Sequence, residues 1–335
     1  MKWNDLGEFG FIRRITSGRV ISRDHVVIGP GDDAAAWRPE PESLCLLTTD
    51  MLIEGIHFQL GYFEPEQLGH KSLAVNFSDI AAMGGKPRDA YLSLGIPVER
   101  LTVAFMDRFY AGVGALAGKW GVNILGGDTS HSSVLVISVT VTGSVAPDGV
   151  IGRDGASRGD RIFLTGTIGD AAAGLDLLLN RPQHLDRFAD TLVKAHLEPQ
   201  PHLEAAALIA RSGKASAMID VSDGVIQDLG HLCSGPGLGA VLYARDFPLS
   251  PALRSYASLT GMQLPDAALT GGEDYCLLFT ASRKDEEHLR RLFSESGCPM
   301  YCIGSMSESG RIEIVDQNGR HRPVTGTGWD HFEKK

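Results

Sequence analysis

The sequence predicts a mixed α/β protein built from two domains, and three observations lead to this fold class. Its 335 residues are about two average domains in length, and 43% of them are hydrophobic. Apolar residues recur at strand-like and helix-like spacings in alternation along the chain. A segment rich in Gly and Asp, residues 146–160, follows a long strand-like run and precedes a new one. We therefore place a domain boundary there, which gives domains of residues 1–148 and 149–335.

The apolar spacing predicts strands and helices in both domains. The expected strands cover residues 44–47, 90–96, 123–125, 134–145, 161–164, 217–221, 275–279 and 311–315. The expected helices cover residues 65–83, 102–119, 170–179, 202–212, 224–233 and 284–296. Near the end of the chain, Asn318 and Gly319 predict the tight turn of a hairpin.

Composition and charge argue against several classes of function. The chain has 31 Lys and Arg against 41 Asp and Glu, a formal net charge of -10, which disfavours a nucleic-acid groove or an anionic membrane surface as partner. Its five cysteines are scattered and form no C-x-x-C pair, which disfavours a disulfide framework or a structural zinc site. The N-terminus lacks a signal-peptide pattern, and no apolar run approaches the roughly 18 residues of a membrane span. We expect a cytoplasmic protein.

The common nucleotide-binding motifs are missing from the sequence. It contains neither a G-x-x-x-x-G-K-[ST] loop nor the set of motifs that marks protein kinases. Gly112, Gly114 and Ala117 form a G-x-G-x-x-A pattern, but they lie inside an expected helix, so close helix packing explains them better. Any phosphate-bearing ligand must be bound in another way.

Five clusters of aspartate beside Gly, Ser or Thr are the most informative feature. They lie at expected strand ends or on an apolar helix, at residues 29–33, 48–50, 79, 126–129 and 220–224. In the helix, Ser72, Asn76 and Asp79 form a polar stripe on an otherwise apolar element, and a carboxylate there needs a partner. One such cluster by itself is more often a turn or a helix cap. Five of them in both domains favour a shared Mg²⁺ site in an interdomain cleft, because hard oxygen ligands suit Mg²⁺ and the clusters contain no His, Cys or Met.

Four further residues are candidates for binding a substrate, and three of them have an alternative explanation. His57 follows the second cluster closely, although a lone histidine is more often packed in a core. Glu273 follows two glycines at the start of an expected strand. Trp329 lies in an aromatic C-terminal segment, where terminal packing explains it equally well. Arg153 lies in the Gly-rich segment, where it could meet a phosphate or be a solvated surface residue.

Taken in order, seven segments closely resemble the thiamine-monophosphate kinases, from about residue 8 to the C-terminus. These segments are GDDAA, TTDMLIEGIHF, NFSDIAAMGGKP, GGDTS, IDVSDG, GGEDY and GWDHF. That family belongs to a superfamily with aminoimidazole-ribonucleotide synthetase, selenophosphate synthetase and a hydrogenase maturation factor. The resemblance implies their two-domain α/β (α+β) fold and a homodimer formed by strands of the N-terminal domain. It also implies that residues 1–148 bind ATP and Mg²⁺ and that residues 149–335 complete an interdomain active site.

The resemblance also implies a role for individual residues. Several Mg²⁺ ions would be held by Asp33, Thr48, Thr49, Asp50, Asp79, Asp128, Asp220 and Asp223. ATP would contact Tyr110, Gly127, Asp128, Arg153 and Ser222, and thiamine monophosphate would contact His57, Glu273 and Trp329. Asp128 and Arg153 would act most directly in catalysis, with no side chain as general base.

The implied reaction transfers the γ-phosphoryl group of ATP to thiamine monophosphate and yields thiamine diphosphate and ADP, the last step of thiamine diphosphate biosynthesis. The acceptor phosphate is anionic at neutral pH, since the second pKa of a phosphate monoester is about 6, so direct in-line transfer needs no general base. One alternative is another ATP-dependent synthetase of the superfamily, such as a selenophosphate or aminoimidazole-ribonucleotide synthetase. The lack of any cysteine before Cys45 disfavours selenophosphate synthetase, which carries a reactive Cys or selenocysteine near its N-terminus. A second alternative, a non-catalytic Mg²⁺-nucleotide sensor, is disfavoured because all five acidic clusters are present.

Overall fold

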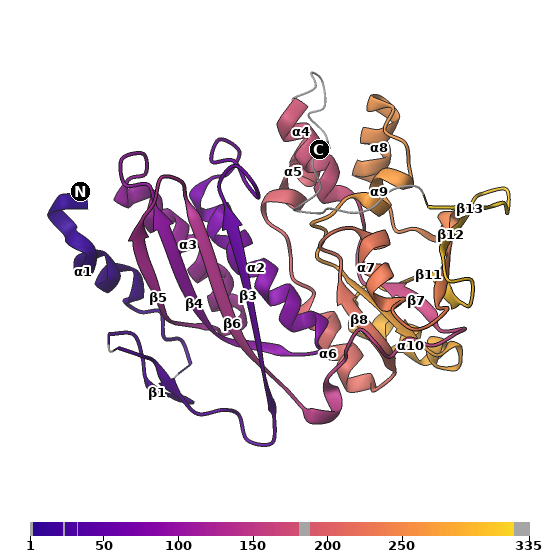
Figure 1. Ribbon diagram of the computed structural model, residues 1–335, viewed down its shortest axis with the longest axis horizontal. Helices are drawn as coiled ribbons and strands as arrows, with labels where there is room; N and C mark the ends of the chain where they lie inside the picture. Colours follow the sequence, from indigo (N-terminus) through magenta and orange to yellow (C-terminus); the bar gives the residue numbers. More distant parts are fainter. Residues whose placement is uncertain (1–2, 23, 32, 181–187, 325–335) are drawn as a thin grey trace. The chain divides into compact units, whose positions relative to one another are not determined.

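The computed structural model describes residues 3–22, 24–31, 33–180 and 188–324, which form two structural units (Figure 1). Unit 1 comprises Met1–Ile80 and Gly85–Pro147, and unit 2 comprises Ala81–Gly84 and Asp148–Lys335. The main division therefore falls one residue from the boundary that composition predicts. Among the described residues, no helix has both the length and the apolar character needed to cross a membrane.

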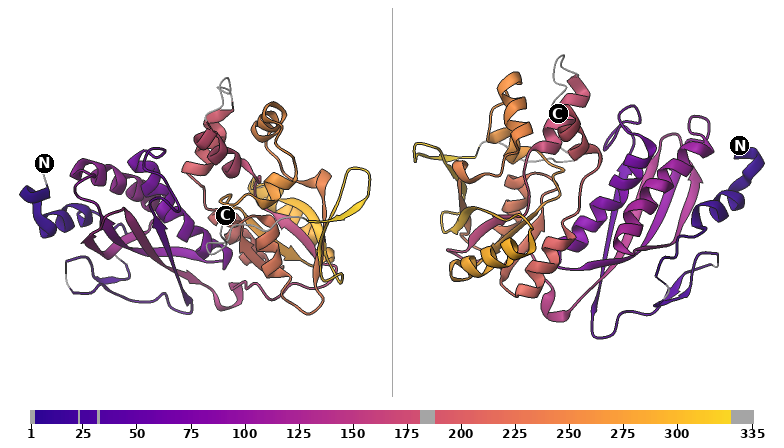
Figure 2. Two further views of the ribbon diagram at one scale, coloured as in Figure 1. Left: turned by 45° about the horizontal axis from the view of Figure 1, so that its top comes forward. Right: turned by 180° about the vertical axis from the view of Figure 1, so that it is seen from behind.

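A four-stranded mixed sheet with helices on one face forms the centre of unit 1 (Figures 1 and 2). The strand order is β3-β6-β4-β5, with β6 antiparallel to both β3 and β4, and β4 parallel to β5. The strands are β3 (Leu44–Ile53), β4 (Lys86–Ile96), β5 (Asn123–His131) and β6 (Val136–Val145). The helices α2 (Pro65–Ala82) and α3 (Val103–Trp120) each connect two parallel strands of this sheet, so both cover the same face.

The strand β3 shows which side chains face these helices. Leu52 is 8% exposed, whereas Leu47 and Met51 are 68% and 52% exposed. Because successive side chains of a strand point to opposite faces, Thr48 and Asp50 share the helix-covered face with Leu52. Thr49 shares the open face with Leu47 and Met51.

Two glycines allow α2 and α3 to pack in backbone contact. A Cβ atom at Gly112 would lie 1.9 Å from the carbonyl oxygen of Glu66, and one at Gly69 would lie 2.0 Å from that of Phe109. Such distances leave no space for any side chain. The prediction that the G-x-G-x-x-A pattern serves helix packing is therefore confirmed at Gly112.

Unit 2 contains a seven-stranded sheet in the order β13-β12-β9-β11-β7-β10-β8. Its strands are β7 (Arg161–Leu164), β8 (Ala215–Asp220), β9 (Gly239–Tyr243), β10 (Leu277–Ala281), β11 (Tyr301–Ser307), β12 (Ile312–Val315) and β13 (His321–Pro323). Its helices are α4 (Asp170–Asn180), α5 (Ala189–Leu197), α6 (Leu203–Ser212), α7 (Val225–Leu232), α8 (Pro251–Thr260), α9 (Asp266–Thr270) and α10 (Glu286–Ser296). The expected turn at Asn318 and Gly319 is confirmed, since it joins β12 to antiparallel β13.

The structure corrects several expected element bounds. The polar residues expected to end two strands lie inside them, because β3 continues to Ile53 and β5 to His131. Strand pairing uses main-chain groups, so Thr and Asp side chains do not end a strand whose neighbour continues to pair with it. Several elements were not expected from the sequence: α1 (Trp3–Thr16), β1 (Val26–Ile28), β2 (Ala36–Trp37), β9, β11, α5, α8 and α9. Most of them are short, so few residues carry their periodicity.

Candidate active site

In unit 1, a strand and a helix bring two of the predicted metal ligands together. The hydroxyl group of Thr48 on β3 donates a hydrogen bond to a carboxylate oxygen of Asp79 on α2, over 2.6 Å. The residues just before Asp79 on the helix are buried, and Asp79 itself is half-buried. The partner that this carboxylate was expected to need is therefore present. Asp50 lies two residues beyond Thr48 on the same face of β3.

The other predicted ligands of unit 1 lie elsewhere on the sheet or outside it. Thr49 is on the open face, where its hydroxyl oxygen accepts a hydrogen bond from Thr140 over 3.0 Å. Asp128 lies on β5, three strands from β3, in the row of residues that contains Ser93 and Met51. Asp33 is exposed in the connection between β1 and β2. In the described part of unit 1, Thr48, Asp50 and Asp79 thus lie on the helix-covered side of the sheet, Thr49 and Asp128 belong to the open face, and Asp33 lies in the β1–β2 connection.

The glycine before Asp128 is required by its surroundings. Gly127 has φ 148°, and a Cβ atom there would lie 1.7 Å from the carbonyl oxygen of Leu92. No other residue could take this position without moving β4. The glycine is therefore required by the packing of β5 against β4.

Tyr110 and His57 are both tied into the structure of unit 1. Tyr110 on α3 is 3% exposed, and its ring packs edge to face against Phe109 and Phe11 at centroid distances of 5.4 and 6.4 Å. Burial raises the pKa of its phenol above the usual range. His57 is half-buried, and its Nδ1 atom accepts a hydrogen bond from the main-chain N–H of Ile53 over 3.0 Å. This bond leaves the Nε2 atom of the neutral ring to carry the proton.

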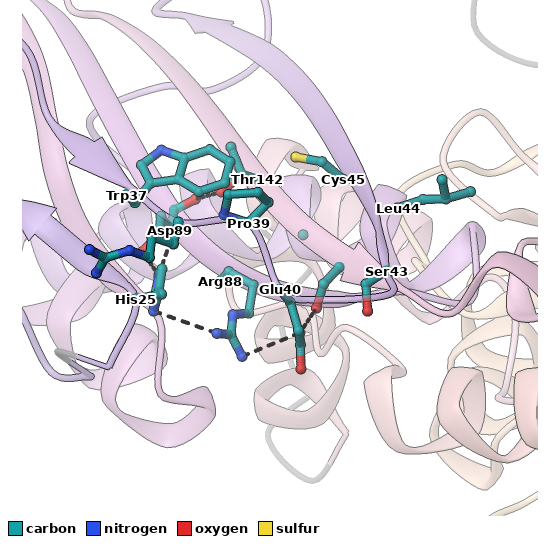
Figure 3. A pocket seen from close by; sticks show the side chains of 13 residues that line it. His25, Trp37, Pro39, Glu40, Ser43, Leu44, Cys45, Arg88, Asp89 and Thr142 are labelled. Carbon is teal, nitrogen blue, oxygen red and sulfur yellow. Dashed lines mark hydrogen bonds and ion pairs between the residues drawn. The ribbon is translucent and has the colours of Figure 1, made fainter.

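A pocket in unit 1 is lined by none of the predicted site residues (Figure 3). Its centre is an ionic network in which the Nε2 atom of His25 lies 2.9 Å from both carboxylate oxygens of Asp89. Arg88 lies 3.5 Å from the other ring nitrogen of His25 and 3.6 Å from a carboxylate oxygen of Glu40. His25 and Glu40 flank the β1–β2 hairpin, and the sheet supplies Arg88 and Asp89. The network therefore anchors the hairpin that carries Asp33.

In unit 2, one buried carboxylate organises the loop that carries the predicted ligands. A single oxygen of Asp228 accepts hydrogen bonds from three successive main-chain N–H groups, those of Ser222, Asp223 and Gly224, over 3.0, 3.2 and 3.1 Å. Three successive amides form an anion-binding concavity. Because Asp228 fills it, a phosphate cannot use these amides, and the hydroxyl group is the part of Ser222 left for a ligand.

The charge of this loop is unusual. Burial, and then the nearby carboxylates of Asp220 and Asp223, raise the pKa of Asp228 to about 8. Asp220 is 3% exposed at the end of β8, and Asp223 accepts a hydrogen bond from the side-chain amide of Gln227 over 3.0 Å. Three acids in one loop repel one another, and a bound cation would relieve that repulsion.

The segment 271–275 lies against the same loop. The N–H of Glu273 donates to the carbonyl oxygen of Ser222, and that of Tyr275 to the carbonyl oxygen of Val221, both over 2.8 Å. A Cβ atom at Gly272 would lie 2.4 Å from the carbonyl oxygen of Ser222, so the two segments touch through their main chains. Glu273 and Tyr275 have φ angles of 69° and 51°, which non-glycine residues adopt rarely and mostly where the surroundings impose them.

Two important acids were missed by the sequence analysis. Asp228 lies on α7 among buried Val225, Ile226 and Leu229, so the argument applied to Asp79, an acid on an apolar helix, would have found it. Asp274 accepts hydrogen bonds from the N–H groups of Gly169 and Ala171 at the start of α4, over 2.7 and 3.4 Å. No sequence pattern links it to a helix a hundred residues away.

The two remaining predicted residues are an arginine and a tryptophan. Arg153 is exposed in the segment that begins unit 2. Trp329 lies outside the described residues. Within the described ranges, no three His, Cys, Asp or Glu side chains come close enough together to hold a metal ion.

Known proteins resemble the chain along nearly its whole length. The family model described as AIR synthase related protein, N-terminal domain, matches residues 31–145, and the corresponding C-terminal domain model matches residues 157–317. Thiamine-monophosphate kinase of Aquifex aeolicus (strain VF5) is 36% identical over 340 residues, which cover 99% of this chain and 100% of the relative. The crystal structure of thiamine-monophosphate kinase from Stenotrophomonas maltophilia K279a has a TM-score of 0.80 at 33% identity, with 92% of this chain and 96% of that chain covered. The structure of AaThiL complexed with AMPPCP and TMP has a TM-score of 0.77 at 35% identity and 99% coverage of both chains.

Two AIR synthase related domains in this order define the class of protein. Within that class the identity over the full length is decisive, and the chain belongs to the thiamine-monophosphate kinase family. The family and the two-domain α/β fold that the seven segments implied are thereby confirmed.

Proposed function

We propose that the chain phosphorylates thiamine monophosphate to thiamine diphosphate with ATP as the phosphoryl donor. The observation that carries this proposal is the match to AaThiL complexed with AMPPCP and TMP, which extends over 99% of both chains. Curated relatives named thiamine-monophosphate kinase support it at 36% identity over the full length. ATP is then a co-substrate that this chain binds without a P-loop.

We propose Mg²⁺ as the metal. The predicted ligands of both units, Asp33, Thr48, Thr49, Asp50, Asp79, Asp128, Asp220 and Asp223, offer only oxygen atoms. Mg²⁺ usually takes one or two carboxylates and completes its shell with water and phosphate oxygens. The group formed by Thr48, Asp50 and Asp79, with one short bond already between two of its members, fits that requirement. When bound, Mg²⁺ neutralises negative charge on the phosphates of the two substrates.

The chain's own residues then have to position two anions for in-line transfer. Thr48 fixes the orientation of Asp79 through its 2.6 Å hydrogen bond. Gly127, Arg153 and the Ser222 hydroxyl group contact ATP in this proposal. Tyr110 is buried in unit 1, so it contributes to ATP binding by packing α3 rather than by an exposed ring. No side chain has to accept a proton, since the acceptor phosphate is already ionised at neutral pH.

The acceptor would be held at its organic end by His57, Glu273 and Trp329. An aromatic face and a carboxylate suit the cationic thiazolium ring of thiamine. We also propose a homodimer formed through the open face of the unit 1 sheet, because the edge strand β3 exposes Leu47 and Met51 there. A cytoplasmic location agrees with the five unpaired cysteines.

The direct test is incubation of the full chain with ATP, Mg²⁺ and thiamine monophosphate. We expect thiamine diphosphate and ADP to form in equal amounts and neither to form without the acceptor. Release of ADP without thiamine diphosphate would contradict the proposal and favour a synthetase of the same superfamily. Stereochemistry at phosphorus tests the direct route: we expect net inversion, and net retention would indicate a covalent intermediate.

A further inference from the structure

A buried histidine of unit 2 contacts the carboxylate proposed to bind the acceptor. His196 lies in the last turn of α5 and is 3% exposed. Its Nδ1 atom is 2.9 Å from an oxygen of Glu273, whose side chain is 29% exposed. The two atoms are within ion-pair distance, and both groups are charged when the ring is protonated. The contact therefore holds one oxygen of Glu273 and leaves the carboxylate partly open to a ligand.

The main chain of Glu273 is fixed as well. Its φ angle of 69° is strained for a glutamate, and its N–H is bound to the carbonyl oxygen of Ser222 over 2.8 Å. Gly272 just before it is pressed against the main chain of residues 222 and 223. Strain of this kind persists only where neighbouring contacts impose it, and it gathers at ligand sites. The strained backbone and the contact with His196 thus both restrict the position of the Glu273 side chain.

The helix that carries His196 is tied to the same segment by a second route. Asp274, next to Glu273, accepts hydrogen bonds from the N–H groups at the start of α4. In turn, α4 and α5 pack in backbone contact, since a Cβ atom at Gly174 would lie 2.0 Å from the carbonyl oxygen of Leu192. A closed path therefore runs from Asp274 through α4 and α5 to His196 and back to Glu273. Hydrogen bonds and main-chain packing thus link the position of His196 to that of the segment 271–275.

We propose that His196 is a positioning residue for acceptor binding: it orients the Glu273 carboxylate toward the cationic ring of the acceptor. The inference rests on the proposed function, which supplies the acceptor. A carboxylate held in one orientation loses less conformational freedom when the ligand binds than one free to rotate. His196 should therefore affect the affinity for thiamine monophosphate, and leave the affinity for ATP and the rate of transfer nearly unchanged.

The test measures binding of thiamine monophosphate to the full chain by calorimetry, together with the steady-state constants for both substrates. We expect His196→Phe to raise the Kd for thiamine monophosphate about tenfold, the effect of losing one close polar contact to a charged group. The KM for ATP should stay within twofold of the wild-type value, and so should kcat. His196→Asn should restore most of the affinity, because its amide nitrogen donates from nearly the position of Nδ1.

Two further comparisons separate positioning from a merely structural contact. His196→Gln places its donor near the position of Nε2 instead, so it should weaken binding as Phe does even if the Phe variant fails to fold. The double variant His196→Phe/Glu273→Gln should bind no more weakly than Glu273→Gln alone, because the histidine acts through that carboxylate. His321→Phe is the matched control: His321 contacts Glu313 over 3.1 Å, and that glutamate is also 29% exposed. This control should keep the wild-type Kd.

The outcomes distinguish this inference from the function on which it depends. If the wild-type chain makes thiamine diphosphate and both His196→Phe and His196→Gln keep the wild-type Kd, the contact is structural only and the inference is wrong. Independent, additive effects of His196 and Glu273 in the double variant would also overturn it. A wild-type chain that neither binds nor phosphorylates thiamine monophosphate would overturn the proposed function and the inference with it.

Discussion

Asp79 in unit 1 and Asp228 in unit 2 are both acids on apolar helices, and they are stabilised in different ways. Asp79 accepts a hydrogen bond from the Thr48 side chain, which comes from a neighbouring strand. Asp228 accepts hydrogen bonds from three main-chain N–H groups in the turn before its own helix. A side-chain partner can be removed without changing the course of the chain. Loss of a partner shared by three main-chain groups should disturb the local fold.

The two acids therefore have different structural roles in their units. In unit 1, main-chain hydrogen bonds hold the strand and the helix in place. The acidic side chains do not contribute to this backbone structure. In unit 2, an acid stabilises the backbone itself. The helix α7 has no side-chain cap at Gly224, and the N–H of Gly224 donates to Asp228 instead. Substitutions in unit 1 should affect activity alone, and substitution of Asp228 should affect stability as well.

The largest effect is expected from Asp50→Asn in unit 1. Asparagine keeps the shape of the side chain and removes the charge that a metal ligand needs, so turnover should fall by about 10³-fold, or about 4 kcal/mol in the barrier. The midpoint of urea unfolding should stay at the wild-type value. Asp107→Asn is the matched control, since Asp107 is an acid of the same unit that pairs with Arg14 on the surface. Near-normal turnover in Asp50→Asn would remove Asp50 from the metal site.

A large effect on stability is expected from Asp228→Leu in unit 2. This change leaves three main-chain N–H groups without their acceptor in a buried turn and should lower the free energy of unfolding by about 4 kcal/mol. Asp228→Asn keeps an acceptor oxygen and should cost about 1 kcal/mol. Urea unfolding of the metal-free chain measures both. Equal and small losses in the two variants would show that the turn does not depend on Asp228, and the contrast between the units would fail.

The same contrast explains what could be predicted from the sequence. Asp79 was singled out because an acid on an apolar helix needs a partner, and that partner is present. The family and fold followed from short motifs that are contiguous in sequence. Asp274 and His196 could not be found, because their roles depend on α4 and α5 approaching the segment 271–275 in space. The lengths of β3 and β5 were underestimated because polar side chains were taken as the ends of these strands. The main-chain hydrogen bonds between strands continue past them.

A smaller effect on stability is expected from His202 as the pH falls. Burial lowers the pKa of His202 to about 4 from an ordinary value of 6.5, while its ring nitrogen Nδ1 lies 2.8 Å from the hydroxyl oxygen of Thr165. The unfolded chain takes up a proton below pH 6.5 and the folded chain resists it, so the contribution of this group is complete above pH 6.5 and is lost toward pH 4. The total loss is up to about 3 kcal/mol.

His202→Gln removes this titration, and the comparison of unfolding free energies at several pH values between 7 and 4.5 isolates it. The variant should show a shallower decline than the wild type over that window. Parallel curves for the two proteins would mean that His202 titrates normally in the folded state. Thr165 also accepts the N–H of Leu277 over 2.9 Å, so the contact of His202 lies beside the start of β10.

The smallest effect is expected from Thr48→Val, which tests the unit 1 half of the contrast. Valine keeps the shape and strand preference of threonine and removes only the hydroxyl group that donates to Asp79. Turnover should fall about tenfold, equivalent to about 1.4 kcal/mol, while the free energy of unfolding changes by about 1 kcal/mol at most. Thr142→Val on β6 is the matched control, because that hydroxyl group reaches only a main-chain carbonyl oxygen at 3.5 Å. A loss of stability in Thr48→Val as large as that in Asp228→Leu would mean that Asp79 stabilises the backbone of unit 1. Asp79 and Asp228 would then not differ in their structural roles.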